Sequence, residues 1–355
     1  MRTSFHPRLI NPPFSDPGLH LSFLFQKRAL LFDLGDLSVL RARDLLKVSH
    51  VFVSHTHMDH FFGFDAFLRA LLGRDREIHL FGPPGFFSNV EGKLAGYTWN
   101  LVDDYRYNLR LRVTEVAPET MRTRVYHCRD RFRPEPETVE KNFSGVLLME
   151  PHFRMEAALL EHRIPCLGLS LVENYYVSII KEKLDDLGIS TGPWLTRFKK
   201  ALYEKRDPDS EFVVTWEKGG AVVKQKGFRL GTLAEKIARI SPGQKISYIT
   251  DVSGSPENKR KILELIKNSD HLFIEAAFLD CDRNLAREKN HLTAKQAGEL
   301  AKEAGVRLLT LFHFSPRYTD RPDELRREAT EAFHGHHRGI RSLGGHRPGT
   351  RFERP

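Results

Sequence analysis

The chain has 355 residues, of which 40% are hydrophobic, and a formal net charge of +9. This composition supports a packed core and argues against a disordered or fibrous protein. Apolar runs fall short of the roughly 18 residues that span a bilayer, and residues 1–7 lack the apolar core of a secretory signal, so we expect a cytoplasmic protein with no membrane contact.

The positive charge is concentrated at the end of the chain. Residues 334–355 contain five arginines and one glutamate, which leaves a net charge of about +5 for the rest. This segment has no apolar period and cannot bury enough surface to offset its chain entropy. We therefore predict a basic, disordered tail over 334–355, after a domain that occupies 1–333.

Three cysteines are widely spaced along the chain, at Cys128, Cys166 and Cys281. They form no C-x-x-C pair, and their odd number argues against a disulfide framework. We interpret them as packing residues.

The first half of the chain alternates predicted strands and helices. Residues 21–25, 51–54 and 78–81 are short apolar runs typical of strands, while 59–72 and 86–97 have helical spacing. The order strand, loop, helix, strand indicates an α/β fold.

The second half repeats this alternation. Predicted strands at 245–250, 271–276 and 306–312 are separated by predicted helices at 256–268 and 293–304. Polar residues recur directly after the strands, which is where α/β proteins place their functional side chains.

Residues 181–228 interrupt the pattern. This stretch is rich in charge, lacks a sustained period and contains the breakers Gly192-Pro193 and Gly219-Gly220. We predict an arm inserted into the domain.

The strongest chemical signal is His55-Thr56-His57-Met58-Asp59-His60. His55 and His57 are two apart at a predicted strand end, so both side chains point to one side and reach the same ion. Asp59 and His60 follow at the turn into a helix, where they are placed to bind a second ion. Composition alone would produce such a string in only about two chains per thousand, so we predict a metal site.

Further ligands must come from elsewhere in the chain, and His162, Asp251 and His313 each follow a predicted strand. His127 competes with His162 for the third histidine position. Asp251 has the alternative role of capping the helix that begins near residue 256.

These residues resemble the metallo-β-lactamase fold and, within it, the ribonuclease Z family that trims transfer RNA 3′ ends. The resemblance spans most of the chain. Its carriers are Phe32-Asp33-Leu34-Gly35, the histidine string, Leu160-Glu161-His162-Arg163-Ile164-Pro165, Thr250-Asp251, His291-Leu292-Thr293-Ala294-Lys295-Gln296-Ala297 and His313-Phe314-Ser315-Pro316-Arg317-Tyr318.

The resemblance implies an αββα sandwich that holds two zinc ions, with manganese or iron as alternatives. It places one ion between His55, His57 and His162, a second between Asp59, His60 and His313, and Asp251 as the bridge. In this scheme a hydroxide shared by the two ions attacks the phosphodiester, and Asp59 orients it.

The resemblance also assigns a proton-transfer role to His291, whose alternative is an ordinary residue at a helix start. An imidazole beside the scissile phosphate would stabilise its charge or protonate the leaving oxygen. Glu275 resembles a family glutamate, but a salt bridge at a strand end explains it equally well.

The implied substrate is a precursor transfer RNA, bound in part by the arm, and family precedent favours a homodimer. Gly192 and Pro193 resemble the arm's Gly-Pro motif, and Arg197, Lys199 and Lys200 are placed to neutralise RNA phosphates. A merely solvated helix is the alternative for these three cations.

Two departures from the family pattern leave the substrate open. The usual Phe-Leu-Gly-Thr strand and Pro-x-Lys-x-Arg-Asn loop are replaced by residues 6–14, and Met58 and residues 61–64 replace smaller or aliphatic residues. Two alternatives therefore remain: a hydrolase of a small ester, thioester, lactone or cyclic nucleotide, and an RNA-binding protein with a structural metal site.

Overall fold

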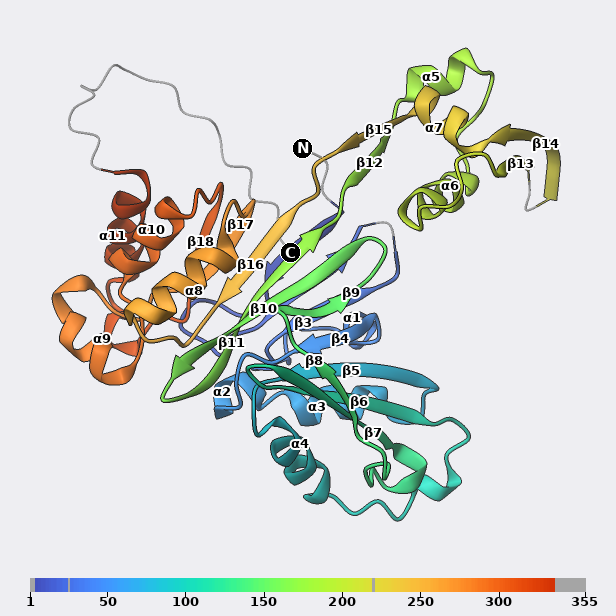
Figure 1. The fold of residues 1–355 in the computed structure, drawn as a ribbon. Helices are drawn as coiled ribbons and strands as arrows, with labels where there is room; N and C mark the ends of the chain where they lie inside the picture. Colours follow the sequence, from blue (N-terminus) through green and yellow to red (C-terminus); the bar gives the residue numbers. More distant parts are fainter. Residues whose placement is uncertain (1–3, 25, 219–220, 336–355) are drawn as a thin grey trace.

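The computed structural model describes residues 4–24, 26–218 and 221–335. Two β-sheets pack face to face, helices cover their outer faces, and an arm protrudes from one end of this body (Figure 1). This arrangement confirms the predicted αββα sandwich. The predicted tail lies outside the described residues except for His334, the last residue of the final helix, and Gly335.

The first sheet of the described chain runs in sequence order and is parallel from β3 to β6 and antiparallel at both ends. Its strands are β1 (Phe5–Leu9), β2 (Leu19–Phe23), β3 (Ala29–Phe32), β4 (Val48–Phe52), β5 (Arg76–Gly82), β6 (Leu109–Val116), β7 (Thr120–His127) and β8 (Val139–Asn142).

The second sheet has the order β18-β17-β16-β11-β10-β9, parallel across its first three strands and antiparallel across the rest. Its strands are β9 (Val146–Met149), β10 (Phe153–His162), β11 (Ile164–Glu173), β16 (Lys245–Ile249), β17 (His271–Glu275) and β18 (Leu309–Phe312).

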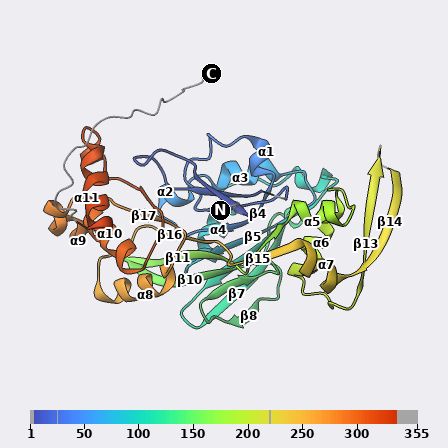
Figure 2. The ribbon, with the colours of Figure 1, turned by 90° about the horizontal axis from the view of Figure 1, so that it is seen from above.

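One hydrophobic core lies between the sheets, where aromatic side chains such as Phe32, Phe52 and Tyr248 are fully buried. Two further cores lie under the outer helices, which form two separate groups on the body (Figure 2). The body helices are α1 (Ala42–Leu45), α2 (Met58–Phe61), α3 (Phe64–Leu71), α4 (Phe86–Ala95), α8 (Pro256–Ile266), α9 (Arg283–Lys289), α10 (Ala294–Glu303) and α11 (Pro322–His334), with 3-10 turns at Val102–Asp104, Cys128–Asp130, Asp280–Asp282 and Pro316–Tyr318.

Two predicted elements differ from the structure. The helix expected over 59–72 is split into α2 and α3 at Gly63, because the chain there passes so close to the Gly35 carbonyl oxygen that a Cβ atom would lie 2.2 Å from it. The strand expected over 306–312 begins only at Leu309. Gly305, at φ +67°, ends the preceding helix, and Leu308 is exposed rather than part of the buried run.

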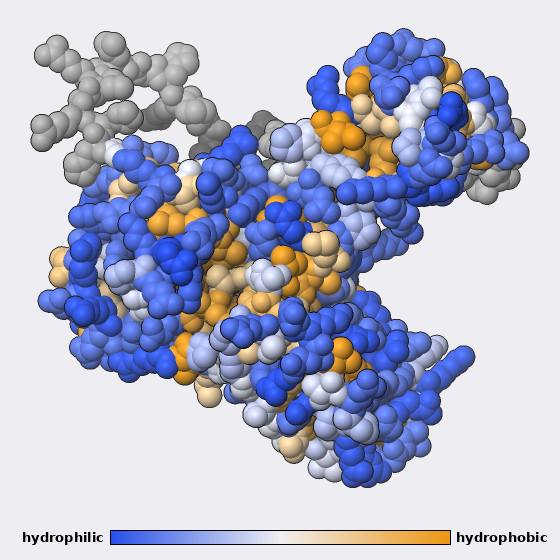
Figure 3. Space-filling model, viewed as in Figure 1, coloured by the Kyte–Doolittle hydropathy of each residue, from blue (hydrophilic) through white to orange (hydrophobic). Residues whose placement is uncertain are grey.

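The arm is longer than the predicted 181–228. Its stalk is the antiparallel pair β12 (Tyr176–Ile179) and β15 (Ala238–Ser241), which carries α5 (Lys181–Asp186), α6 (Trp194–Tyr203), α7 (Leu230–Ile237) and a hairpin of β13 (Glu211–Lys218) and β14 (Ala221–Arg229). A small core that includes Trp194, Phe198 and Leu233 holds these elements together. Figure 3 shows the arm standing apart from the lower lobe across a notch, so it is a separately packed unit.

No helix among the described residues has the length and hydrophobicity required to cross a membrane.

Candidate metal centre

Segments far apart in sequence converge at one edge of the sandwich, opposite the arm (Figure 1). His162 is the last residue of β10 and His313 comes directly after β18, whereas Asp251 follows β16 after one intervening residue, Thr250. His55 follows β4 by three residues. Polar residues follow these strands in the sequence because the strand ends meet in space and form one site.

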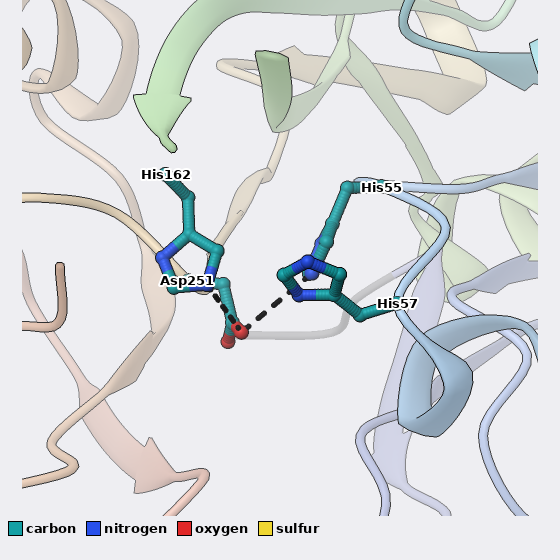
Figure 4. A group of neighbouring side chains, drawn as sticks. All are labelled: His55, His57, His162 and Asp251. Carbon is teal, nitrogen blue, oxygen red and sulfur yellow. Dashed lines mark ion pairs between the residues drawn. The ribbon is translucent and has the colours of Figure 1, made fainter. Parts of the chain in front are cut away.

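The first predicted ligand cluster surrounds one oxygen of Asp251. Its Oδ2 lies 3.6 Å from His55 Nε2 and 3.4 Å from His162 Nε2. The rings of His57 and His162 are 5.3 Å apart between centroids, and the four side chains face a common point (Figure 4).

The second cluster surrounds the other oxygen of Asp251. Its Oδ1 lies 3.5 Å from His60 Nε2 and 3.1 Å from His313 Nδ1. Asp59 Oδ2 closes this group at 3.4 Å from His60 Nε2 and 3.2 Å from His313 Nε2. The structure thus brings together all seven predicted ligands, with Asp251 between the two clusters.

The donor set fits a pair of divalent ions. Within the described chain, His55 Nε2, His60 Nε2 and His313 Nδ1 are buried nitrogens without a hydrogen-bond partner, which is costly for a protein unless another group satisfies them. Two ligands of a tetrahedral zinc ion with bonds of about 2.1 Å lie about 3.4 Å apart. The separations of 3.4–3.6 Å around Asp251 Oδ2 match this value.

Three residues of the site have left-handed backbone conformations: Asp33 at φ 58°, Asp251 at φ 48° and His313 at φ 57°. Such angles are uncommon outside glycine and persist where the surrounding structure enforces them. Their concentration here indicates that the backbone is held in place to aim these side chains.

Asp33 forms a supporting layer whose role the sequence motif did not indicate. It is fully buried and accepts hydrogen bonds from the Ser54 amide at 2.6 Å and the Tyr248 hydroxyl at 2.9 Å. Its Oδ2 also lies 2.9 Å from His60 Nδ1. Asp33 therefore orients the His60 ring and leaves Nε2 facing the cluster. The sequence did offer one indication, because Asp33 directly follows the apolar strand β3, just as His313 directly follows β18.

The first cluster has a comparable support. His162 Nδ1 lies 2.7 Å from the backbone oxygen of Asn290, so this ring donates to a carbonyl and presents Nε2 to Asp251. His55 Nδ1 lies 3.1 Å from the Ser54 hydroxyl. Both histidines are thereby held with one nitrogen toward the common point.

The buried Glu275 and the partly buried His291 form a pair beside the clusters. Glu275 Oε2 is 2.7 Å from His291 Nδ1, and its Oε1 accepts from the Val252 amide at 2.8 Å. Burial lowers the pKa of His291, but the Glu275 carboxylate outweighs burial and raises it. Glu275 ends β17 and so forms the ion pair at a strand end that the sequence left open, but with a residue of the site: it holds the His291 ring in place and favours its protonated form.

The charges around Asp251 favour its ionised form. Burial raises the pKa of this carboxyl, but His313 and His60 lower it well below its usual range. Conversely, burial lowers the pKa of His313, and the neighbouring carboxylates of Asp251 and Asp59 raise it to about 10. The Asp251 carboxylate therefore stays ionised and available to a cation, whereas His60 and His313 must release their protons before they can ligate a metal ion.

Three open alternatives are decided by position. His127 lies at the end of β7, where it contacts Glu135 at 2.7 Å and Asn108 at 2.9 Å, and it belongs to neither cluster. The helix α8 is capped by Ser255 and not by Asp251. The packing interpretation of the cysteines is wrong for Cys281, which is exposed because it lies in the turn before α9, whereas Cys128 and Cys166 are buried.

The predicted RNA-binding residues lie on the arm, at and after the start of α6. Gly192 and Pro193 precede Trp194, whose ring is buried in the arm core and whose Nε1 donates to the Ser190 carbonyl oxygen at 3.0 Å. The cations that follow differ in setting: Arg197 donates to Thr215 at 2.7 Å, Lys199 lies 5.8 Å from the Tyr176 ring centroid, and Lys200 lies 3.6 Å from Glu204.

Comparison with known proteins agrees with this geometry. A family profile described as a beta-lactamase superfamily domain matches residues 224–314. The fold resembles the metallo-beta-lactamase fold protein YhfI from Bacillus subtilis, with a TM-score of 0.53 and 15% identity over 93% of this chain and 94% of that one. It also resembles human tRNase Z, short form, with a TM-score of 0.50 and 18% identity over 88% and 93%.

Sequence similarity is more specific. Ribonuclease Z of Deinococcus radiodurans is 31% identical over 295 residues, which cover 82% of this chain and 83% of that protein. Ribonuclease Z of Methanosarcina mazei is 28% identical over 312 residues, covering 86% and 84%. With its two facing ligand clusters and this degree of identity, the chain belongs to the ribonuclease Z family of the metallo-β-lactamase fold.

Proposed function

We propose that this protein is an endoribonuclease that trims the 3′ ends of precursor transfer RNA. The observation that carries the proposal is Asp251, whose two oxygens face two separate ligand clusters in a chain with 31% identity to a ribonuclease Z. A site of this kind suits phosphodiester cleavage, in which both the attacking and the leaving oxygen need stabilisation.

We assign His55, His57 and His162 to one divalent ion, Asp59, His60 and His313 to the other, and Asp251 to both, with zinc as the expected metal. When bound, the ions supply Lewis acidity that lowers the pKa of water and neutralises phosphate charge. Histidine nitrogens and carboxylate oxygens are the ligands that zinc uses in hydrolases.

Two side chains have separate roles in the reaction. Asp59, whose side chain is 40% exposed at the mouth of the site, accepts a hydrogen bond from the attacking water and aligns it with the phosphorus atom. Protonated His291, with Nδ1 held by Glu275, donates from Nε2 to the leaving 3′ oxygen. The products are a transfer RNA with a 3′ hydroxyl and a trailer with a 5′ phosphate.

The arm is proposed to grip the RNA at a distance from the cut. The ten-residue strands β10 and β11 run from the metal cluster to the base of the arm, a span of about 33 Å. A ligand that contacts both regions must therefore be long, as transfer RNA is. We also propose a cytoplasmic homodimer, in which one subunit's arm reaches RNA bound at its partner's site.

The decisive experiment is incubation of the metal-loaded protein with a precursor transfer RNA that carries a 3′ trailer, with the cut mapped to the nucleotide. We expect one cut, at the junction of the transfer RNA and the trailer. Turnover of a small ester without cleavage of this RNA would instead support the small-molecule hydrolase, and RNA binding that survives metal removal without any turnover would support the structural-metal alternative.

A second experiment separates the arm from the chemistry. Because Ile179 pairs with Ala238 across the stalk, residues 180–237 can be replaced by Asn-Gly, which suits a two-residue hairpin turn. We expect this variant to lose precursor cleavage and to keep hydrolysis of bis(p-nitrophenyl) phosphate. Equal loss of both activities, or loss of neither, would count against an RNA-binding role for the arm.

The role of His291 is tested by His291→Ala. We expect a rate loss on the order of a hundredfold at unchanged metal content, since general acid catalysis contributes about 10²–10⁴. Unaltered activity with full metal occupancy would remove His291 from the mechanism.

A further inference from the structure

Two large apolar side chains are exposed at the histidine string, one within it and one two residues after its last histidine. Met58 is 80% exposed and Phe62 is 57% exposed. Neither belongs to any of the hydrophobic cores of the described chain, whereas their neighbour Phe61 is 4% exposed and packs in the core under the outer helices. Folding therefore does not explain their apolar character.

The backbone places these two side chains on one face. The Phe62 amide donates to the Met58 carbonyl oxygen at 2.7 Å, which is the hydrogen bond of one α-helical turn, and Phe62 itself is helical at φ −56° and ψ −41°. Residues four apart in such a turn are neighbours on the helix surface. The Met58 thioether and the Phe62 ring thus form an apolar pair that faces solvent.

The apolar pair is contiguous with the metal centre. On the same turn, His60 is fully buried and points toward Asp33 on the opposite side, while Asp59 lies between the two faces with its side chain 40% exposed. His57, directly before Met58, is exposed as well. Because Met58 lies between His57 and Asp59 in the chain, a group attached next to a phosphate bound at those two residues comes within reach of the apolar pair.

We propose that Met58 and Phe62 form a stacking platform for the nucleobase next to the scissile phosphate. This inference rests on the proposed function and adds a determinant of substrate choice to it. Nucleobases stack on aromatic rings and on polarisable sulfur without a need for a particular sequence, because every base has a π face. A flat apolar surface beside a phosphate-handling site suits a nucleotide better than a small charged or aliphatic ester.

The test compares substrates with and without a base. We prepare Phe62→Ala, Met58→Ala and the double variant, with Leu308→Ala as control. Leu308 is 53% exposed, like the apolar pair, but it lies just before the first residue of β18, whereas the metal centre lies beyond the last. The readout is the ratio of kcat/KM for the precursor RNA to kcat/KM for bis(p-nitrophenyl) phosphate, at measured metal content. Removal of one stacking interaction should lower this ratio about tenfold in the double variant, Phe62→Trp should preserve it, and Leu308→Ala should not change it.

Abasic precursors locate the contact. An abasic nucleotide on one side of the cut should lower kcat/KM of the wild-type protein about as much as the double substitution does. On that abasic RNA the double variant should have the same kcat/KM as the wild-type protein, because the two changes remove one and the same interaction. Losses that multiply would overturn the proposal, as would an unchanged ratio in the double variant.

Two further outcomes are distinguishable. Failure of the wild-type protein to cut any precursor overturns the proposed function together with this inference, whereas normal precursor cleavage by the double variant overturns this inference alone. A lowered ratio accompanied by a change of oligomeric state in sedimentation would assign the pair to a subunit contact and would also overturn it.

Discussion

The metal centre, with its two ligand clusters, and the arm differ in how they hold their functional side chains. In the cluster, His55 and His60 are fully buried and Asp251 is 3% exposed, and each is fixed by neighbouring polar groups. On the arm, Arg197 and Lys200 are exposed, and they lie against Thr215 and Glu204 at the surface. Chemistry at a phosphorus atom requires fixed geometry, whereas attraction of a polyanion requires only charge in the right region.

The two regions also fold on separate cores. The arm core contains only arm residues, and the stalk strands β12 and β15 connect it to the body. Additional contacts form where Tyr203 of α6 meets the base of the stalk, since its ring centroid lies 4.2 Å from that of His152 and 5.2 Å from that of Tyr175. Damage to the arm should therefore leave the cluster intact, and the following predictions test this separation.

The largest effect is expected for Asp251→Asn. The amide retains the left-handed backbone angle, which asparagine tolerates, but it supplies one acceptor oxygen where two are needed. We expect loss of bound metal and a fall on the order of 10³ in both precursor and small-diester hydrolysis, since both ions depend on this side chain. Metal analysis and steady-state kinetics measure it, with the arm variant Asp209→Asn as control. Retention of two ions at full activity would contradict the bridging role.

Asp33→Asn should have the next largest effect. An amide cannot accept from the Ser54 amide, the Tyr248 hydroxyl and His60 at the same time, so the His60 ring loses its orientation. Removal of such a supporting group typically lowers metal affinity or activity about 10–100-fold. Titration with a zinc chelator measures the affinity. An affinity equal to that of the wild-type protein would show that Asp33 serves only the fold.

The ligands of the metal centre could be predicted from the sequence because they lie where strands end. His162, Asp251 and His313 each follow an apolar run, and the histidine string is too improbable to arise by composition. Geometry was needed to separate His162 from His127 and to show that Asp251 faces two clusters. The supporting roles of Asp33 and Glu275 were not readable, because they depend on hydrogen bonds between distant segments.

From the sequence, the arm could be predicted only as an interruption of the alternating strands and helices. Its helices are short, and the buried positions of α6, such as Trp194 and Phe198, pack against a hairpin more than ten residues away, so no long period marks them. The break at Gly63 was missed for a similar reason, since a close approach to Gly35 is invisible in local sequence. Long-range packing was the missing information in both cases.

Trp194→Ala should unfold the arm without disturbing the cluster. Trp194 is fully buried in the arm core, and truncation of such a side chain costs about 3–5 kcal/mol. We expect faster hydrogen exchange in residues 180–237 and a loss of about tenfold in kcat/KM for the precursor, with small-diester hydrolysis retained. Trp216→Ala is the matched control, because Trp216 is only partly buried. Equal loss of small-diester hydrolysis in Trp194→Ala would show that the arm and the cluster are one cooperative unit.

The smallest effect is expected for single cations of the arm. Arg197→Ala and Lys200→Ala each remove one exposed charge, and Lys200 already faces Glu204 at 3.6 Å, so part of its field is cancelled. We expect a rise of about two- to threefold in KM for the precursor, with kcat unchanged. The slope of log affinity against log salt concentration should fall by about 0.7–0.9 for each phosphate that the variant no longer neutralises. Arg197→Ala should have the larger effect, because Arg197 donates to the uncharged Thr215 hydroxyl, which cancels none of its charge. If both variants leave the salt slope unchanged, α6 is a solvated helix, and the arm holds RNA through another of its surfaces.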